Sequence, residues 1–147
     1  MKENQNQMDY NIWSATEYKN NLEDIYSIQD TIKANPSTKW SSIGEQSLHL
    51  TATINSYQAV LIKQISMNNN ISLTAELDIL HKKGGNNQLR ITQADNTYTD
   101  VNIPVNTNPQ HISLSKQITV EGTVKIFFIM RENSDEAYID NISLTAS

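Results

Sequence analysis

The sequence predicts an all-β protein, an antiparallel β-sandwich of two sheets. Apolar residues alternate with polar ones in successive short runs from residue 46 onward, and turn-forming residues separate these runs. Alternation with a period of two indicates strands that bury one face, and several short strands at this spacing favour a sandwich over β–α–β units. At 147 residues, the whole chain, 1–147, is expected to form a single domain with its own core.

The elements follow in order along the chain. Segment 14–30 holds a weak helical stripe, so we expect at most one short helix near residues 15–27, although an irregular loop or a strand at 25–32 also fits. Everything after it is expected to be strand and turn. The expected strands are 46–54, 57–65, 71–79, one beginning at 89, 98–103, 112–118, 124–130 and 136–144.

Segment 71–79 carries the strongest alternation in the chain. It ends at Lys82-Lys83-Gly84-Gly85-Asn86-Asn87, a glycine- and asparagine-rich stretch that predicts a hairpin turn into the next strand. A second polar stretch, 131–136, predicts a hairpin loop into the final strand.

The composition excludes several classes of protein. The chain has no Cys, so disulfides and thiolate metal sites are excluded, and its net charge of -5 argues against a nucleic-acid partner. No apolar run approaches the roughly 20 residues of a membrane span, so we expect no direct membrane insertion. The polar start shows no signal peptide. Either a cytosolic protein or a module of a larger secreted chain is compatible with this, and we favour the second.

Catalysis is not expected. His49, His81 and His111 stand apart with no metal-ligand spacing, and there is no nucleophile or phosphate-loop motif. Glu76 and Asp78 lie two residues apart on one strand face, where they could mimic the acid pair of a glycosidase, but a solvated strand face explains them better.

Asp140 lies inside the last expected strand, between apolar residues. A carboxylate buried in a strand is costly unless a cation or a set of hydrogen-bond donors compensates it. Asp140 therefore either binds a metal ion or closes a hydrogen-bonded corner.

The order of these features resembles the jelly-roll carbohydrate-binding modules of families 4, 9 and 22. The matching residues are Trp40, 44–50, 57–59, 71–79, 124–130 and 138–144, within roughly residues 38–147. The first strand departs from the family pattern and reads Asn11-Ile12-Trp13-Ser14. The asparagine-rich, cysteine-free style also resembles adhesin-like surface proteins of methanogenic archaea.

The resemblance implies a jelly roll and a non-catalytic module, extracellular or at the cell surface, that attaches a larger surface protein or enzyme to a polysaccharide or glycan. It also implies a structural Ca²⁺ between the first and last strands, held by oxygen ligands. Asp140 matches the family's ligand position, and Asp9 or Glu17 could supply the partner carboxylate.

The ligand surface is expected at outward strand positions. These are Glu76 and Asp78 on one strand, Gln88 and Arg90 on its neighbour, and Phe127 and Arg131 on a late strand, with Tyr57 either a stacking platform or part of the core. An apolar outward face also fits a covering segment such as 14–30, or an interface. A structural or protein-binding adhesin domain without a sugar site is therefore the alternative function.

Overall fold

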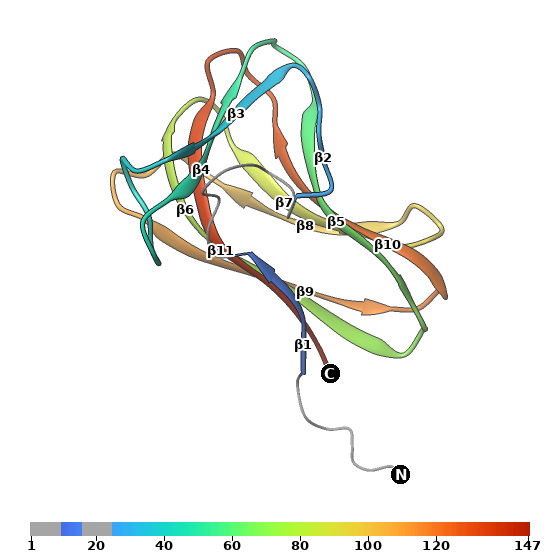
Figure 1. Cartoon of the computed structure of the whole chain (residues 1–147). Coiled ribbons are helices and arrows are strands. Elements are labelled where there is room, and N and C mark those ends of the chain that lie inside the picture. The colour runs from blue at the N-terminus through green and yellow to red at the C-terminus, as the bar shows by residue number, and fades with distance from the viewer. Residues whose placement is uncertain (1–9, 16–24) are drawn as a thin grey trace.

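The computed structural model is an all-β sandwich (Figure 1) and describes the backbone of residues 10–15 and all of residues 25–147. Its strands are β1 (Tyr10–Ala15), β2 (Ser27–Ile28), β3 (Ile32–Ser37), β4 (Ser47–Ala52), β5 (Gln58–Met67), β6 (Ile71–Lys83), β7 (Asn87–Thr92), β8 (Tyr98–Ile103), β9 (Gln110–Ile118), β10 (Gly122–Met130) and β11 (Glu136–Ala146). These residues contain no helix, and most of the segment expected as a short helix, 16–24, lies outside them. Within the described part, no helix could therefore span a membrane.

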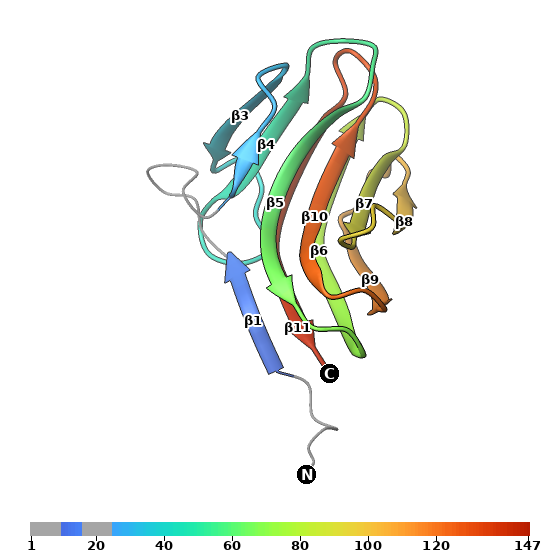
Figure 2. The same ribbon diagram turned by 90° about the vertical axis from the view of Figure 1, so that its right-hand side faces the viewer.

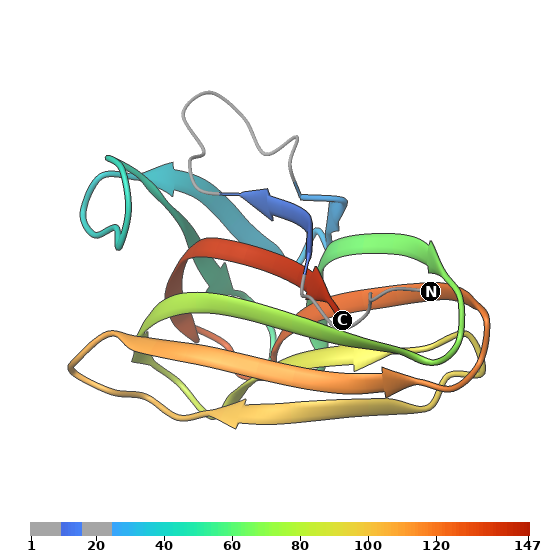
Figure 3. The same ribbon diagram turned by 90° about the horizontal axis from the view of Figure 1, so that it is seen from below.

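Two antiparallel sheets form the sandwich. The six-stranded sheet has the order β3-β4-β11-β6-β9, and β1 pairs with the C-terminal half of β11 (Figure 3). The five-stranded sheet has the order β2-β5-β10-β7-β8 and lies in front of β11 and β6 in Figure 2. This arrangement confirms the predicted two-sheet β-sandwich.

The two hairpins predicted at 82–87 and 131–136 are wrong. β6 and β7 belong to different sheets, and so do β10 and β11, so both segments cross from one sheet to the other. Gly84 has φ 115° and lies so close to Asp135 that a Cβ there would overlap the carboxylate. The glycine therefore permits close packing at the end of the sandwich. A glycine-rich stretch alone does not distinguish such an arch from a hairpin.

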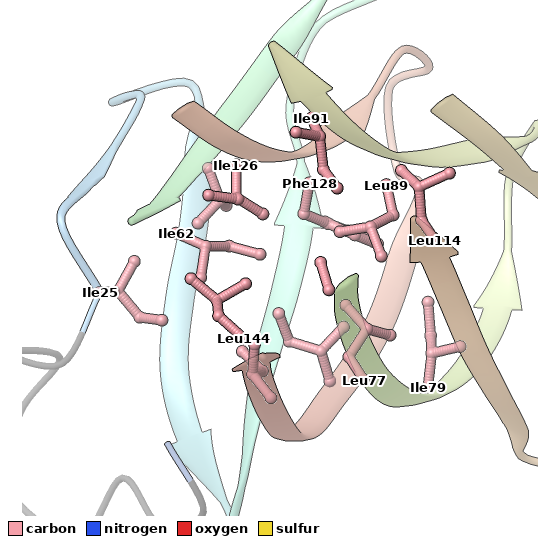
Figure 4. Close-up of a cluster of buried hydrophobic side chains, with 14 of the residues drawn as sticks. Ile25, Ile62, Leu77, Ile79, Leu89, Ile91, Leu114, Ile126, Phe128 and Leu144 are labelled. Carbon is pink, nitrogen blue, oxygen red and sulfur yellow. The ribbon is translucent and has the colours of Figure 1, made fainter. Parts of the chain in front are cut away.

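The core fills the space between the sheets. In the alternating strands one set of side chains points inward, so Leu77 and Leu144 from the six-stranded sheet face Leu89 and Phe128 from the other (Figure 4). All four are essentially inaccessible to solvent. Burying a side chain of this size contributes about 1.5–3 kcal/mol, so this layer fixes which residues of each strand point outward.

A buried polar cluster closes one end of the core. His81 of β6 and Asp135 are both fully buried, and the His81 Nε2–H donates to Asp135 Oδ1 at 2.8 Å. The Nδ1–H donates to the Ile103 carbonyl at 3.0 Å, and Asn87 Nδ2 donates to Asp135 Oδ2 at 2.8 Å. A neutral imidazole has only one N–H, so the charged form of His81 satisfies both acceptors.

Candidate functional site on the outer face of the five-stranded sheet

The outward side chains of the five-stranded sheet lie in three rows across its strands. Gln88 has Asn102 and Ile129 as its cross-strand neighbours, and Arg90 has Asp100 and Phe127. Thr92 has Tyr98 and Lys125. We call these positions, together with Ala59, Leu61, Tyr57 and Arg131, the aromatic face.

Arg90 forms the centre of one polar group on this face. Its Nε and Nη2 both donate to Asp100 Oδ2, at 3.1 and 2.9 Å. Its guanidinium carbon lies 3.8 Å from the centre of the Tyr98 ring, within the range of a cation–π contact. The ion pair and the stacking hold Tyr98 in place although its side chain is 53% exposed. An exposed ring thus gains a defined orientation.

Arg131 forms a second group of the same kind. Its Nε and Nη2 donate to Gln88 Oε1 at 3.2 and 2.8 Å, and its guanidinium carbon lies 5.3 Å from the centre of the Tyr57 ring. Gln88 Nε2 in turn donates to Asn102 Oδ1 at 3.0 Å. Tyr57 is 41% exposed, so of its two predicted roles the structure favours the surface one. A chain of planar polar groups therefore runs from Arg131, just beyond β10, across β7 to β8.

Apolar side chains lie between these two groups. Phe127 and Leu61 are half-buried cross-strand neighbours. Ile129 points away from the core, yet it is fully buried, so its neighbours on the aromatic face cover it. The predicted outward position of Phe127 agrees with this register. The aromatic face thus combines an apolar strip with hydrogen-bonding groups on both sides.

Beside Lys125 the surface is hollowed. A cavity of about 240 Å³ there is lined by Thr92, Gln93, Ala94, Asn96, Thr123 and Lys125. Flat rings bind the apolar faces of sugar rings, while amides, guanidinium groups and carboxylates suit sugar hydroxyls. The face and the hollow together present both kinds of group.

The structure brings together five of the seven predicted ligand residues and separates the other two. Tyr57, Gln88, Arg90, Phe127 and Arg131 all belong to the aromatic face. Glu76 and Asp78 lie on β6, in the six-stranded sheet, and point away from the sandwich on its opposite side. They were expected on a strand next to Gln88 and Arg90, and that expectation fails because the connection at 82–87 changes sheets.

The expected strand 98–103 is confirmed as β8, but Tyr98, Asp100 and Asn102, which it supplies to the aromatic face, were not among the predicted ligand residues. The signal was present, because Asp95-Asn96 predicts a turn between two strands and fixes which residues face each other. Asn96 has φ 70° there, and the Asp95 carboxylate accepts hydrogen bonds from Thr97.

The outer face of the six-stranded sheet carries an acidic cluster. His111 lies between Asp78 and Glu76, with Nδ1 2.7 Å from Asp78 Oδ1 and Nε2 2.8 Å from Glu76 Oε1. The bonds to Asp78 and Glu76 raise the pKa of His111. Burial alone would raise the pKa of Asp78, but hydrogen bonds, first of all from His111, lower it. The single imidazolium balances only one of the two carboxylates, so the cluster remains acidic.

Asp140 forms a hydrogen-bonded corner beside that cluster. Its Oδ2 accepts the backbone N–H groups of Ser42 and Ile43, at 2.9 and 3.0 Å, and the Ser42 hydroxyl at 3.3 Å. Its Oδ1 accepts the Asn141 N–H at 2.8 Å. Asn141 has φ 50° at an irregularity in β11, a conformation that asparagine tolerates better than most residues. The corner ties the 38–46 loop to the last strand.

The described surroundings of Asp140 do not fit a calcium site. Its neighbours are N–H and O–H donors, whereas Ca²⁺ takes six to eight oxygen ligands. Within residues 25–147, no group of three or more His, Asp or Glu is arranged to hold a metal ion. Asp9 and Glu17 lie outside the described residues, so the calcium ion stays a prediction of the resemblance.

Thermal melting with Ca²⁺ and with a chelator tests whether the protein binds calcium. We expect the same Tm in both conditions, because the Asp140 carboxylate already accepts hydrogen bonds from several donors and needs no cation. A higher Tm in Ca²⁺ that is lost in Asp9→Asn or Glu17→Gln would contradict this expectation and restore the calcium site.

A scan against protein-family models finds no match, and a search of the curated proteins also finds none. Solved structures do match. The CBM22-1 xylan-binding domain of Paenibacillus barcinonensis Xyn10C has 8% identity and a TM-score of 0.68, over 90% of this chain and 91% of that one. The module CBM6cm-2 of Cellvibrio mixtus lichenase 5A, solved with cellotriose, has 12% identity and a TM-score of 0.59, over 92% and 97%.

A third structure contains such a module next to a catalytic domain. The CBM22-1–GH10 modules of Clostridium thermocellum xylanase 10B, solved with xylohexaose, have 9% identity and a TM-score of 0.63, over 93% of this chain and 28% of that one. The fold of this protein is thus the jelly-roll β-sandwich of carbohydrate-binding modules, which confirms the predicted resemblance at the level of fold.

Proposed function

We propose that this protein is a non-catalytic carbohydrate-binding module that attaches a larger surface protein or enzyme to a polysaccharide or cell-surface glycan. The observation that carries the proposal is the pair of arginine–tyrosine stacks, Arg90–Tyr98 and Arg131–Tyr57, on either side of the apolar strip around Phe127. The similar structures, which are named as carbohydrate-binding modules, support a binding role. We place the protein outside the cell, where such a glycan would be met.

The geometry explains how such binding would work without catalysis. The rings are held by their arginines before any ligand arrives, so little side-chain freedom is lost on binding. The amides of Gln88 and Asn102 then meet hydroxyl groups, and the apolar strip accepts the C–H faces of sugar rings. Each contact is weak and no reacting group is activated.

Tyr98→Ala tests the proposal with little risk to the fold, because the ring is mostly exposed. We expect it to weaken glycan binding about tenfold, the loss of one stacking contact. A glycan-array screen of the wild type identifies the ligand, and calorimetry with that ligand measures the change. Tyr98→Phe, which keeps the ring, is expected to bind nearly as well as the wild type.

Gln117→Ala is the matched control. Gln117 is exposed on β9, on the outer side of the other sheet, so its loss is expected to leave affinity unchanged. Equal losses in Gln117→Ala and Tyr98→Ala would place binding elsewhere. Absence of binding to every glycan on the array would refute the proposal.

The structural or protein-binding adhesin domain is the second candidate. The observation that favours it is that Phe127 and Leu61 are apolar and partly exposed on the aromatic face, because exposed apolar side chains also mark protein interfaces. Capture of a defined protein partner through this face, with no glycan bound, would support the second candidate over the first.

A further inference from the structure

We propose that the aromatic face prefers glycans that carry carboxylate groups, that is, polysaccharides with uronic acid units, over neutral ones. This inference rests on the proposed function and names the substrate class of the same site. It is carried by the distribution of charge on the face and by the opposite distribution on the other side of the molecule.

Three cations, including both arginines of the chain, lie on the aromatic face. Arg90 and Arg131 are the only arginines in the chain, and both belong to the face, together with Lys125. Lys125 and Arg131 are six residues apart on and just beyond β10, so about 20 Å of strand separates them. Arg90 lies beside Phe127, between them. Positive groups are therefore spread along the face and not confined to one end.

The carboxylate on the face and the one in the neighbouring turn already accept hydrogen bonds within the protein. Asp100 is the one acidic residue among the positions that make up the face, and both of its bonds from Arg90 go to Oδ2. The Asp95 carboxylate, in the neighbouring turn, accepts from the backbone and hydroxyl of Thr97. Glu132 follows Arg131, but its carboxylate lies against Gly85. None of these groups cancels the charge of Arg131.

Arg131 is the cation best suited to a ligand carboxylate. Among the described residues it has no acidic partner, since its Nε and Nη2 bond to the neutral Gln88 amide. A carboxylate in place of that amide oxygen would convert ordinary hydrogen bonds into charge-assisted ones, which are about twice as strong. The planar fork of arginine matches the two oxygens of a carboxylate and can bind them with two parallel hydrogen bonds.

The opposite side of the molecule has the reverse character. Glu76 and Asp78 lie on the outer side of the six-stranded sheet, where His111 bridges them. The chain as a whole has 16 acidic and 11 basic residues. An acidic protein that gathers its arginines on one face carries a directional field, which would orient an anionic polymer toward that face.

Pectin provides a probe that isolates the charge. Homogalacturonan of low methyl esterification and the same polymer at high esterification differ in the number of free carboxylates and not in the sugar. We expect affinity electrophoresis and calorimetry to show tighter binding to the de-esterified form. Raising the salt from about 50 to about 500 mM should reduce that preference, because it screens exposed charge. Dextran sulfate and neutral dextran form a second pair, which tests whether the face binds anionic polymers whatever their charged group.

Arg131→Gln tests the residue. It keeps a polar side chain of similar length, and we expect a loss of about fivefold toward the de-esterified polymer with little change toward the esterified one. Lys33→Gln is the control for net charge, because Lys33 is exposed on β3 of the other sheet. If it reduced binding as much as Arg131→Gln does, general charge would be responsible and the inference would be overturned.

The outcomes separate this inference from the proposed function. Binding to neutral glycans that depends on Tyr98, with no effect of esterification or of Arg131→Gln, would overturn the carboxylate preference and leave the carbohydrate-binding role intact. Binding to no glycan, neutral or anionic, would refute both. A stronger response to the sulfated polymer than to the carboxylated one would assign a different anion to the face.

Discussion

Asp135→Ala is expected to lower the free energy of unfolding by about 3–5 kcal/mol, the usual cost of leaving one member of a buried ion pair without its partner. Asp135 accepts hydrogen bonds from His81 and Asn87, and neither donor could bond to water instead, because both side chains are fully buried. Urea unfolding followed by tryptophan fluorescence measures the change. Asp135→Asn keeps the shape but places an amide donor opposite Asn87 Nδ2, so it too should destabilise the protein.

The stability lost in Asp135→Ala should depend on pH, because the charge of His81 depends on pH. Burial alone lowers its pKa, but the bond and charge of Asp135 outweigh burial and raise the pKa above 6.5. Stability from this pair is therefore complete below the unfolded pKa of 6.5 and is lost as pH rises through the higher folded pKa. The difference between wild type and Asp135→Ala should be larger at about pH 6 than at about pH 9.

Glu121→Ala is the control for this experiment, because Glu121 is exposed in the turn before β10. It should change the unfolding free energy by no more than about 0.5 kcal/mol, with no difference between the two pH values. If Asp135→Ala were equally mild, His81 and Asp135 would not be the buried charged pair that the distances describe.

Asp140→Ala should be the second strongly destabilising change, by about 2–4 kcal/mol. The N–H groups of Ser42, Ile43 and Asn141 would all lose the carboxylate that they now share. Hydrogen exchange should report the location of the damage, with faster exchange at the Ser42 and Ile43 amides and little change in β7 and β10.

Two comparisons make the Asp140 result specific. Glu45→Ala removes an exposed carboxylate from the same loop and should alter neither stability nor exchange. Asp140→Asn keeps an acceptor oxygen for part of the set and should lose roughly half as much stability as Asp140→Ala. Unchanged amide exchange in Asp140→Ala would contradict the corner.

The strands could be predicted from the sequence, but their division between two sheets could not. Alternation in β6, as in Leu73, Ala75 and Leu77, depends only on one buried face, and both sheets provide one. Whether 82–87 turns back or crosses depends on how Gly84 packs against Asp135, which is 51 residues further along the chain (135 − 84). The sequence around residues 82–87 therefore does not predict that contact.

The same limit explains the partly predicted site. Outward positions on β7 and β10 follow from alternation, so Gln88, Arg90 and Phe127 were found. Glu76 and Asp78 obey the same alternation but lie on the other outer face, because each sheet of a sandwich has an outer face of its own. The arginine–tyrosine stacks join residues on different strands, and only the sheet register reveals them.

The position of β11 has a consequence for how the protein forms. This strand comes last among those described, yet it lies between β4 and β6 and also carries β1 on its edge. During synthesis, β1 and β4 therefore lack their partner strand β11 until residues 136–146 have been made. β3 and β4 can pair with each other early, but β4 gains its second neighbour only when the long loop to β11 closes, and such non-local pairing favours slow folding.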